Sequence, residues 1–176
     1  MLQQLPNLLS LARLAIAPYL FWLLWRGHFN TALWAILFAG ITDGLDGFLA
    51  RKLNVSSRTG EVLDPIADKI LLSFAFVALW LNGSVEGWLT AIILGRDVLI
   101  LAAAGVALLL ARIPRRFPPS LWGKLSTIVQ ISLVVTLAAR IPEPVLGIVK
   151  WTTAALTVVS FLHYARLFIS ERYTRN

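Results

Sequence analysis

Six runs of apolar residues, each long enough to cross a bilayer as a helix, constrain this chain more than any other feature. Short breaks rich in Gly, Pro, Asn and Ser separate the runs, and none of the breaks is long enough to hold a second domain. Of the 176 residues, 58% are hydrophobic and only 14% are charged, which is far from the average of soluble domains. The runs are Leu8 to Trp25, Asn30 to Ala50, Glu61 to Leu81, Trp88 to Ala111, Leu121 to Ala139 and Val145 to Phe168. We therefore expect an all-α integral membrane protein with six transmembrane helices, forming a single membrane domain over residues 1–176.

The breaks between the runs differ in charge, and this difference predicts the orientation of the chain. Basic residues concentrate in one set of loops and in the C-terminal tail, whereas the other set holds Arg26 and Arg140. By the positive-inside rule the basic side is cytoplasmic, so both termini are expected there. The basic set consists of Arg51, Lys52, Arg58, Arg112, Arg115, Arg116, Arg172 and Arg175.

Tryptophan residues support the same orientation, because most of them fall at the opposite helix ends, where an interfacial aromatic belt belongs. These are Trp22, Trp25, Trp34, Trp80, Trp88 and Trp151. The net charge of +7 follows from the cytoplasmic loops, which would lie against anionic lipid headgroups. Membrane lipids, and no nucleic acid, are therefore the partners that this charge predicts. We expect the first run to be a membrane span rather than a signal peptide, since no small-residue cleavage site follows it.

Four aspartates interrupt the second and third apolar runs. Asp43 and Asp46 lie at the end of the second run, and Asp64 and Asp68 lie at the start of the third. An aspartate in the middle of a bilayer helix costs about 3 kcal/mol on insertion scales, so such a group indicates a functional site. Each pair has helical spacing, which puts its members on one helix face, and the short connection lets the two faces meet at the cytoplasmic side.

A pocket of four carboxylates needs a bound cation. Two carboxylates about 4 Å apart repel each other by about 4 kcal/mol at an effective dielectric of 20. Oxygen ligands without His or Cys favour Mg²⁺, Mn²⁺ or Ca²⁺ over zinc or copper, and Mg²⁺ is the usual partner where carboxylates face phosphate. Four aspartates can hold two such ions. The chain has no cysteine, which excludes a thiolate metal site and a disulfide framework.

Small residues lie on the same helix faces as the aspartates. Gly47 and Ala50 follow Asp43 by one and two turns, and Gly60 precedes Asp64 by one turn. Such residues can let a phosphate approach, although close helix packing is the alternative when no carboxylates are nearby. Arg51 suits a charge-assisted contact with that phosphate.

These residues resemble the signature of the CDP-alcohol phosphatidyltransferase family. The segment Asp43-Gly-Leu-Asp46-Gly47-Phe-Leu-Ala50-Arg51, eight further residues and Gly60-Glu-Val-Leu-Asp64-Pro-Ile-Ala-Asp68 match every position of it. The resemblance implies an enzyme of phospholipid biosynthesis, a metal-dependent transferase that moves a phosphatidyl group from CDP-diacylglycerol to an alcohol and releases CMP. It also implies a homodimer in the bacterial cytoplasmic membrane, with the active site facing the cytoplasm.

The resemblance also implies roles for single residues. Asp43 and Asp64 would bind both of two Mg²⁺ ions, Asp46 would bind the first, and Asp68 would bind the second and act as general base. Mn²⁺ is a potential substitute. CDP-diacylglycerol would be bound by Asn7, Gly47, Arg51, Ser57 and Gly60. Asn7 belongs to the segment Pro6-Asn7-Leu-Leu-Ser10-Leu-Ala-Arg13, which is similar to the start of the family's first helix. The alternative is a helix cap, with Arg13 extending to the headgroups.

The acceptor alcohol depends on residues outside the signature. Arg115, Arg116 and Lys124 are cytoplasmic candidates for holding an acceptor phosphate, and ordinary positive-inside charge is the alternative. Arg96 and Asp97 lie deep in the fourth run, where adjacent positions should point in different directions and each should need a partner elsewhere in the bundle. His163 and Tyr164 are expected to be interfacial rather than catalytic.

The segment Gly95-Arg96-Asp97-Val98, with Gly123-Lys124 and Gln130, resembles the branch with phosphatidylglycerophosphate synthases and cardiolipin synthases of the same fold. The candidate acceptors are glycerol 3-phosphate, phosphatidylglycerol, inositol phosphate and serine. Glycerol 3-phosphate is favoured among them, and phosphatidylglycerol, giving cardiolipin, is the alternative within this branch. An ion-conducting protein is a further alternative, but the aspartates lie at one membrane face with no relay across it. A catalytically silent scaffold is disfavoured by the complete aspartate set.

Overall fold

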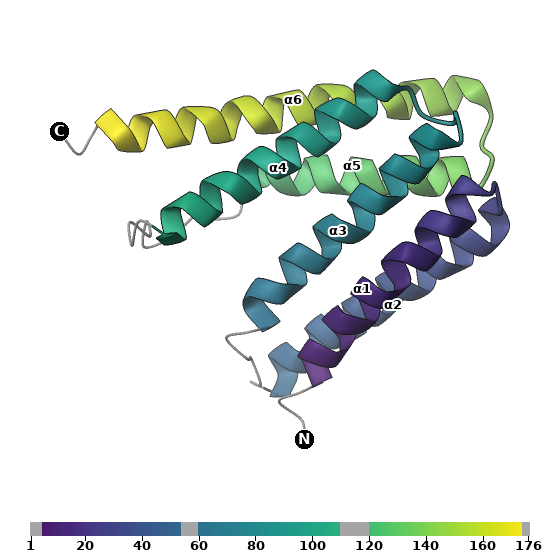
Figure 1. Ribbon diagram of the computed structural model, residues 1–176, viewed down its shortest axis with the longest axis horizontal. Coiled ribbons are helices and arrows are strands. Elements are labelled where there is room, and N and C mark those ends of the chain that lie inside the picture. The colour runs from purple at the N-terminus through teal and green to yellow at the C-terminus, as the bar shows by residue number, and fades with distance from the viewer. Residues whose placement is uncertain (1–4, 54–59, 110–119, 174–176) are drawn as a thin grey trace. The chain divides into compact units, whose positions relative to one another are not determined.

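The computed structural model describes residues 5–53, 60–109 and 120–173, with side chains described over 12–41, 67–102 and 120–166. This part of the chain forms six α-helices (Figure 1). They are α1 (Leu5–Trp25), α2 (Phe29–Leu53), α3 (Gly60–Leu81), α4 (Gly87–Leu109), α5 (Leu121–Ala138) and α6 (Glu143–Tyr173). The all-α prediction is confirmed, and each predicted run becomes one helix.

The helix ends differ from the predicted ones by a few residues, except at the C-terminus. There α6 continues to Tyr173, although its apolar run ends at Phe168. A helix can extend past its apolar run because hydrophobicity reports burial or lipid contact, whereas backbone hydrogen bonding decides helix length.

Glycines end two of the helices. Gly27 follows α1 with a φ of 73°, and Gly83 follows α3 with a φ of 80°. Gly27 donates its N–H to Leu24 O and His28 donates to Leu23 O, at 3.1 and 2.8 Å, which satisfies carbonyls that a helix end leaves open. A left-handed backbone of this kind favours glycine.

The chain divides into two compact units. The first comprises residues 1–85 and 134–141, and the second comprises residues 86–133 and 142–176. In the first unit α1 packs against both α2 and α3 (Figure 1). Buried alanines at the core of this unit allow close helix approach, as is usual in membrane bundles. They include Ala17, Ala32, Ala67, Ala75 and Ala78.

One end of the first unit brings two turns together. The side-chain amide of Asn82, just after α3, donates to the carbonyl of Trp25 at the end of α1, at 3.0 Å. Trp25 and Trp80 are about half exposed there. This grouping fits the predicted aromatic belt on one side of the membrane.

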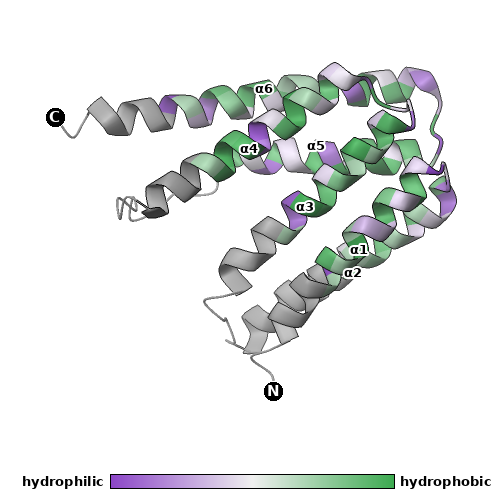
Figure 2. Ribbon diagram, viewed as in Figure 1, coloured by the Kyte–Doolittle hydropathy of each residue, from purple (hydrophilic) through white to green (hydrophobic). Residues whose placement is uncertain are grey.

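In the second unit several polar side chains are buried and several large apolar ones are exposed. Ser126, Gln130 and Thr157 are fully buried, whereas Ile148 and Trp151 on α6 are 68% and 70% exposed. Large exposed apolar side chains are what helices in contact with lipid present, because lipid rather than protein covers them. Figure 2 shows mainly hydrophobic residues along the described parts of the helices and hydrophilic ones at the turns.

Two helices in the described part of the chain are long and apolar enough to cross a membrane. They are Leu121–Ala138 in α5 and Glu143–Arg166 in α6, and shorter apolar stretches occupy Ala12–Trp25 and Phe29–Ile41. Six helices are therefore confirmed, whereas six membrane spans and the cytoplasmic position of both termini stay predictions.

Candidate active site

The four aspartates lie on the two helices that the sequence predicts. Asp43 and Asp46 belong to the C-terminal half of α2, and Asp64 and Asp68 belong to the first turns of α3. Both segments are helical, so the spacing that places each pair on one helix face holds. The side chains of Asp43, Asp46 and Asp64 lie outside the described residues, and that of Asp68 lies within them.

Asp68 pairs with an arginine of α1. The Nη1 of Arg13 donates to Oδ1 of Asp68 in an ion pair that joins α1 to α3 within the first unit. The two partners differ in burial: the side chain of Arg13 is 7% exposed and that of Asp68 is 47% exposed. Arg13 therefore does not extend to the headgroups, which corrects that alternative. It stays inside because α1 packs against α3 and an opposite charge is within reach.

The other predicted nucleotide and acceptor residues are less fully described. Asn7, Gly47, Arg51 and Gly60 lie on helical backbone of α1, α2 and α3, with side-chain positions outside the described residues. Ser57, Arg115 and Arg116 lie outside the described residues altogether. Lys124 lies in the first turn of α5 and is exposed.

The four aspartates of the signature are chemically suited to bind divalent cations. They offer carboxylate oxygens only, and their described member, Asp68, keeps about half of its side chain open beside a buried guanidinium. Hard oxygen ligands with room around them suit Mg²⁺, which retains waters and binds phosphate oxygens. The two-ion assignment stays a prediction.

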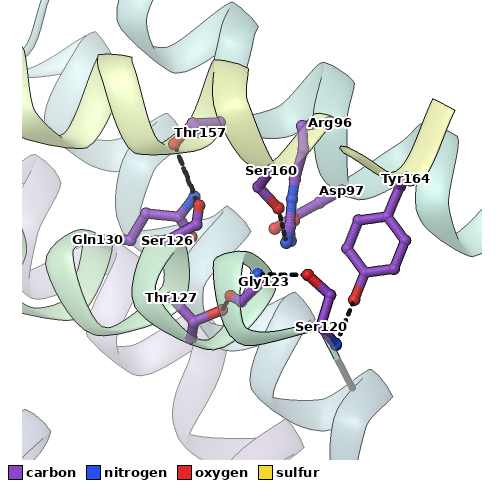
Figure 3. A network of polar contacts seen from close by, with 10 residues as sticks. All are labelled: Arg96, Asp97, Ser120, Gly123, Ser126, Thr127, Gln130, Thr157, Ser160 and Tyr164. Atoms are coloured by element: carbon purple, nitrogen blue, oxygen red, sulfur yellow. Dashed lines mark hydrogen bonds and ion pairs between the residues drawn. The ribbon is translucent and has the colours of Figure 1, made fainter. Parts of the chain in front are cut away.

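A second polar cluster lies in the second unit, among α4, α5 and α6 (Figure 3). Arg96 Nη1 contacts Oδ1 of Asp97 at 2.6 Å, and Arg96 Nη2 donates to the hydroxyl of Ser160 on α6 at 2.8 Å. Arg96 and Asp97 are both buried. Arg96 thus has a partner elsewhere in the bundle, as the sequence predicts, and it also pairs with its sequence neighbour, because a long arginine side chain can turn toward an adjacent carboxylate when both are buried.

Tyr164, with its side chain half-buried, packs against this cluster, and its interfacial rather than catalytic position stays a prediction. Its hydroxyl accepts a hydrogen bond from the backbone N–H of Ser120 at 3.4 Å, and its ring lies 5.8 Å from the Arg96 guanidinium carbon. The hydroxyl of Ser120 in turn accepts from the N–H of Gly123 at 3.2 Å, which caps the start of α5. A Cβ at Gly123 would lie 2.9 Å from the Tyr164 hydroxyl.

Small polar side chains continue from this cluster along α5 and α6. The amide of Gln130 donates to the hydroxyls of Ser126 and Thr157, each at 3.3 Å, and Thr153 donates to the carbonyl of Val129 at 3.3 Å. Hydrogen bonds between helices of this kind add to helix association where lipid supplies no hydrophobic driving force. From the sequence, Gln130 was noted only as part of the family resemblance. The spacing of Thr153, Thr157 and Ser160, four and seven residues apart, places them on one face of α6, and this pattern could have predicted a polar helix contact.

An exposed ion pair joins Lys150 of α6 to Glu86, which precedes α4, at 2.9 Å. Burial by itself would raise the pKa of Glu86, but hydrogen bonds from Lys150 and from its own backbone N–H, with the Lys150 charge, outweigh it and lower the pKa below the ordinary 4.5. A lowered pKa in the folded state means that the pair stabilises the fold above the ordinary pKa and loses that effect as the pH falls through the lowered one.

Comparison with known proteins gives a family assignment. The model of the family described as CDP-alcohol phosphatidyltransferase matches residues 3–159, which include all four aspartates and Arg13. This match covers most of the chain. The chain belongs to the CDP-alcohol phosphatidyltransferase family, and the resemblance in its signature is confirmed.

Relatives fall into two groups by their names. Cardiolipin synthase (CMP-forming) of Rattus norvegicus is 35% identical over 92% of this chain and 61% of its own length. CDP-diacylglycerol--glycerol-3-phosphate 3-phosphatidyltransferase of Aquifex aeolicus is 38% identical over 73% of this chain and 72% of its own length. A probable phosphatidylglycerophosphate synthase of Mycobacterium tuberculosis is 36% identical over 91% of this chain and 79% of its own length. The chain thus spans about 60% of the mammalian cardiolipin synthase that it matches.

Proposed function

We propose that this protein is a metal-dependent membrane transferase that moves the phosphatidyl group of CDP-diacylglycerol to glycerol 3-phosphate, forming phosphatidylglycerophosphate and CMP. The observation that carries this proposal is the family match over residues 3–159, which spans the complete aspartate signature. The half-exposed carboxylate of Asp68 at the start of α3 supports it, because a general base must be reachable by its substrate.

In the proposed reaction the acceptor hydroxyl oxygen attacks the phosphorus that carries the diacylglycerol. Asp68 takes the hydroxyl proton, a new P–O bond forms, and the P–O bond to the cytidylate breaks, so that CMP leaves with the electron pair. Two Mg²⁺ ions, when held by Asp43, Asp46, Asp64 and Asp68, would neutralise charge developing on the phosphate oxygens. Asn7, Gly47, Arg51, Ser57 and Gly60 bind the CDP moiety.

Glycerol 3-phosphate is the favoured acceptor, and two bacterial relatives named for phosphatidylglycerophosphate formation, of whose length the chain covers 72% and 79%, support this choice. Arg115, Arg116 and the exposed Lys124 bind the acceptor phosphate in this proposal. Phosphatidylglycerol, giving cardiolipin, is the second candidate, since the rat cardiolipin synthase matches 92% of this chain. The enzyme is proposed to act as a homodimer in a bacterial cytoplasmic membrane, with its site facing the cytoplasm.

The test offers the two acceptors separately to purified protein with radiolabelled CDP-diacylglycerol and Mg²⁺. We expect labelled phosphatidylglycerophosphate with glycerol 3-phosphate and no cardiolipin with phosphatidylglycerol. Cardiolipin alone would establish the second candidate, and no product with either acceptor would refute both. Lys124→Gln should raise KM for glycerol 3-phosphate but not for CDP-diacylglycerol, whereas Lys150→Gln, which alters an ion pair elsewhere, should change neither.

A further inference from the structure

The ion pair between Arg13 and Asp68 links the candidate site to a residue outside the signature. Arg13 lies in the middle of α1, among apolar residues, and its side chain is 7% exposed. A charged residue in such a position costs several kcal/mol unless a partner compensates it, so its presence indicates a function.

The need to balance the charge of Asp68 does not explain why Arg13 is buried beside it. The carboxylate of Asp68 is about half exposed, so mobile surface cations or solvent could balance its charge. The buried partner is the arginine, which the packing of α1 against α3 holds in place. A fixed guanidinium on one oxygen of a half-open carboxylate limits how that carboxylate can rotate.

We propose that Arg13 is a positioning residue for Asp68: it fixes the orientation of the carboxylate that would take the acceptor proton and help to hold a metal ion. This inference rests on the proposed function. It follows from geometry, because a general base acts only within hydrogen-bond reach of the proton that it removes. A displacement of about 1 Å at a reacting group can lower the rate by about 100-fold.

The first test separates turnover from binding. Arg13→Gln should lower kcat on the order of 10- to 100-fold while KM for CDP-diacylglycerol changes little, since Asp43, Asp46 and Asp64 are untouched. Arg13→Lys should recover part of the loss, because lysine keeps the charge but lacks the planar fork of the guanidinium. Arg26→Gln, at an exposed arginine that follows α1 and stacks on Trp25, is the matched control and should keep wild-type kinetics.

The second test measures the pairing without turnover. In EDTA, Arg13→Gln should lower the thermal midpoint when Asp68 is present but not in an Asp68→Asn background, since coupled residues are not additive. Equal effects in both backgrounds, or wild-type kcat in Arg13→Gln, would overturn the proposal. If the wild-type protein releases no CMP with either acceptor, the proposed function fails and this inference fails with it. Active wild-type protein with an unaffected Arg13→Gln variant refutes the inference alone.

Discussion

Gly123 leaves the least space for an added Cβ among the described glycines. A Cβ built there would lie 2.9 Å from the Tyr164 hydroxyl, 3.2 Å from Tyr164 Cε2 and 3.3 Å from Nη2 of Arg96. The first distance is shorter than carbon and oxygen tolerate, and the tyrosine ring is rigid, so the ring itself would have to move. The glycine therefore allows α5 to approach the polar cluster around Arg96.

We predict that Gly123→Ala destabilises the protein by about 1 to 3 kcal/mol, as overpacking does elsewhere. The matched control is Gly147→Ala in α6, where no atom lies within 4 Å of the added carbon. That control should be neutral or gain up to about 1 kcal/mol, because alanine favours helix over glycine. Thermal midpoints in detergent measure both variants, and equal midpoints would contradict the packing argument.

The structure shows which side chains the buried polar residues contact, and these contacts could not be predicted from the sequence. Burial could be expected for Arg96 and Asp97 because they interrupt an apolar run, but their pairing with each other depends on side-chain rotamers that sequence does not specify. The burial of Arg13 likewise depends on the packing of α1 against α3. The aspartates of the signature could be placed on helices α2 and α3 because their spacing is local.

At the level of helices, two ion pairs of the second unit provide a direct contrast. The Arg96–Asp97 pair is buried, with each side chain 4% exposed, whereas Glu86 in the Glu86–Lys150 pair is 47% exposed. Removing one member of a buried pair leaves the other charge uncompensated in a medium of low dielectric. Exposed pairs contribute little, since water and salt screen them.

We predict that Asp97→Ala lowers the free energy of unfolding by about 3 to 5 kcal/mol. The double variant Arg96→Met, Asp97→Leu should lower the free energy of unfolding by less than Asp97→Ala does, because it leaves no unpaired buried charge. Glu86→Gln should cost less than about 1 kcal/mol near neutral pH and nothing below the lowered pKa of Glu86, where the carboxyl is protonated. Unfolding by SDS titration in detergent micelles measures all three. Equal losses for Asp97→Ala and Glu86→Gln would contradict the contrast.

Helix boundaries were predictable where turn residues mark them, as at Gly27 and Gly83, whose positive φ values end α1 and α3. The long extension of α6 to Tyr173 was not predictable from the apolar pattern, because polar residues continue a helix as readily as apolar ones. The interhelical hydrogen bonds of Gln130 could not be assigned from sequence, since they need the relative rotation of α5 and α6.

For the whole molecule, the prediction of six spans with cytoplasmic termini rests on the basic loops and the tryptophan belt. The prediction of one domain over residues 1–176 also remains a prediction, since the structure separates into two compact units. The family model matches one continuous stretch, residues 3–159, which contains segments of both units.

Cysteine labelling tests the topology cleanly, because the chain has no cysteine of its own. In intact cells or oriented vesicles, cysteines introduced by Ser56→Cys and Ser170→Cys should react only with reagents that reach the cytoplasm. Ser84→Cys, in the turn between α3 and α4, should react from the opposite side. Labelling of the Ser56 and Ser84 positions from the same side would refute the six-span arrangement.

Release of radiolabelled CMP from CDP-diacylglycerol is the direct test of metal-dependent transfer. Wild-type protein and Asp64→Asn are purified alike and supplied with glycerol 3-phosphate. We expect that wild-type protein releases CMP with Mg²⁺, that EDTA stops the release, and that added Mg²⁺ or Mn²⁺ restores it. Asp64→Asn should insert and purify normally but release CMP at least about 100-fold more slowly, because it removes a carboxylate proposed to bind both ions. Undiminished release in EDTA, or release at the wild-type rate by Asp64→Asn, would refute metal-dependent phosphatidyl transfer by the four aspartates.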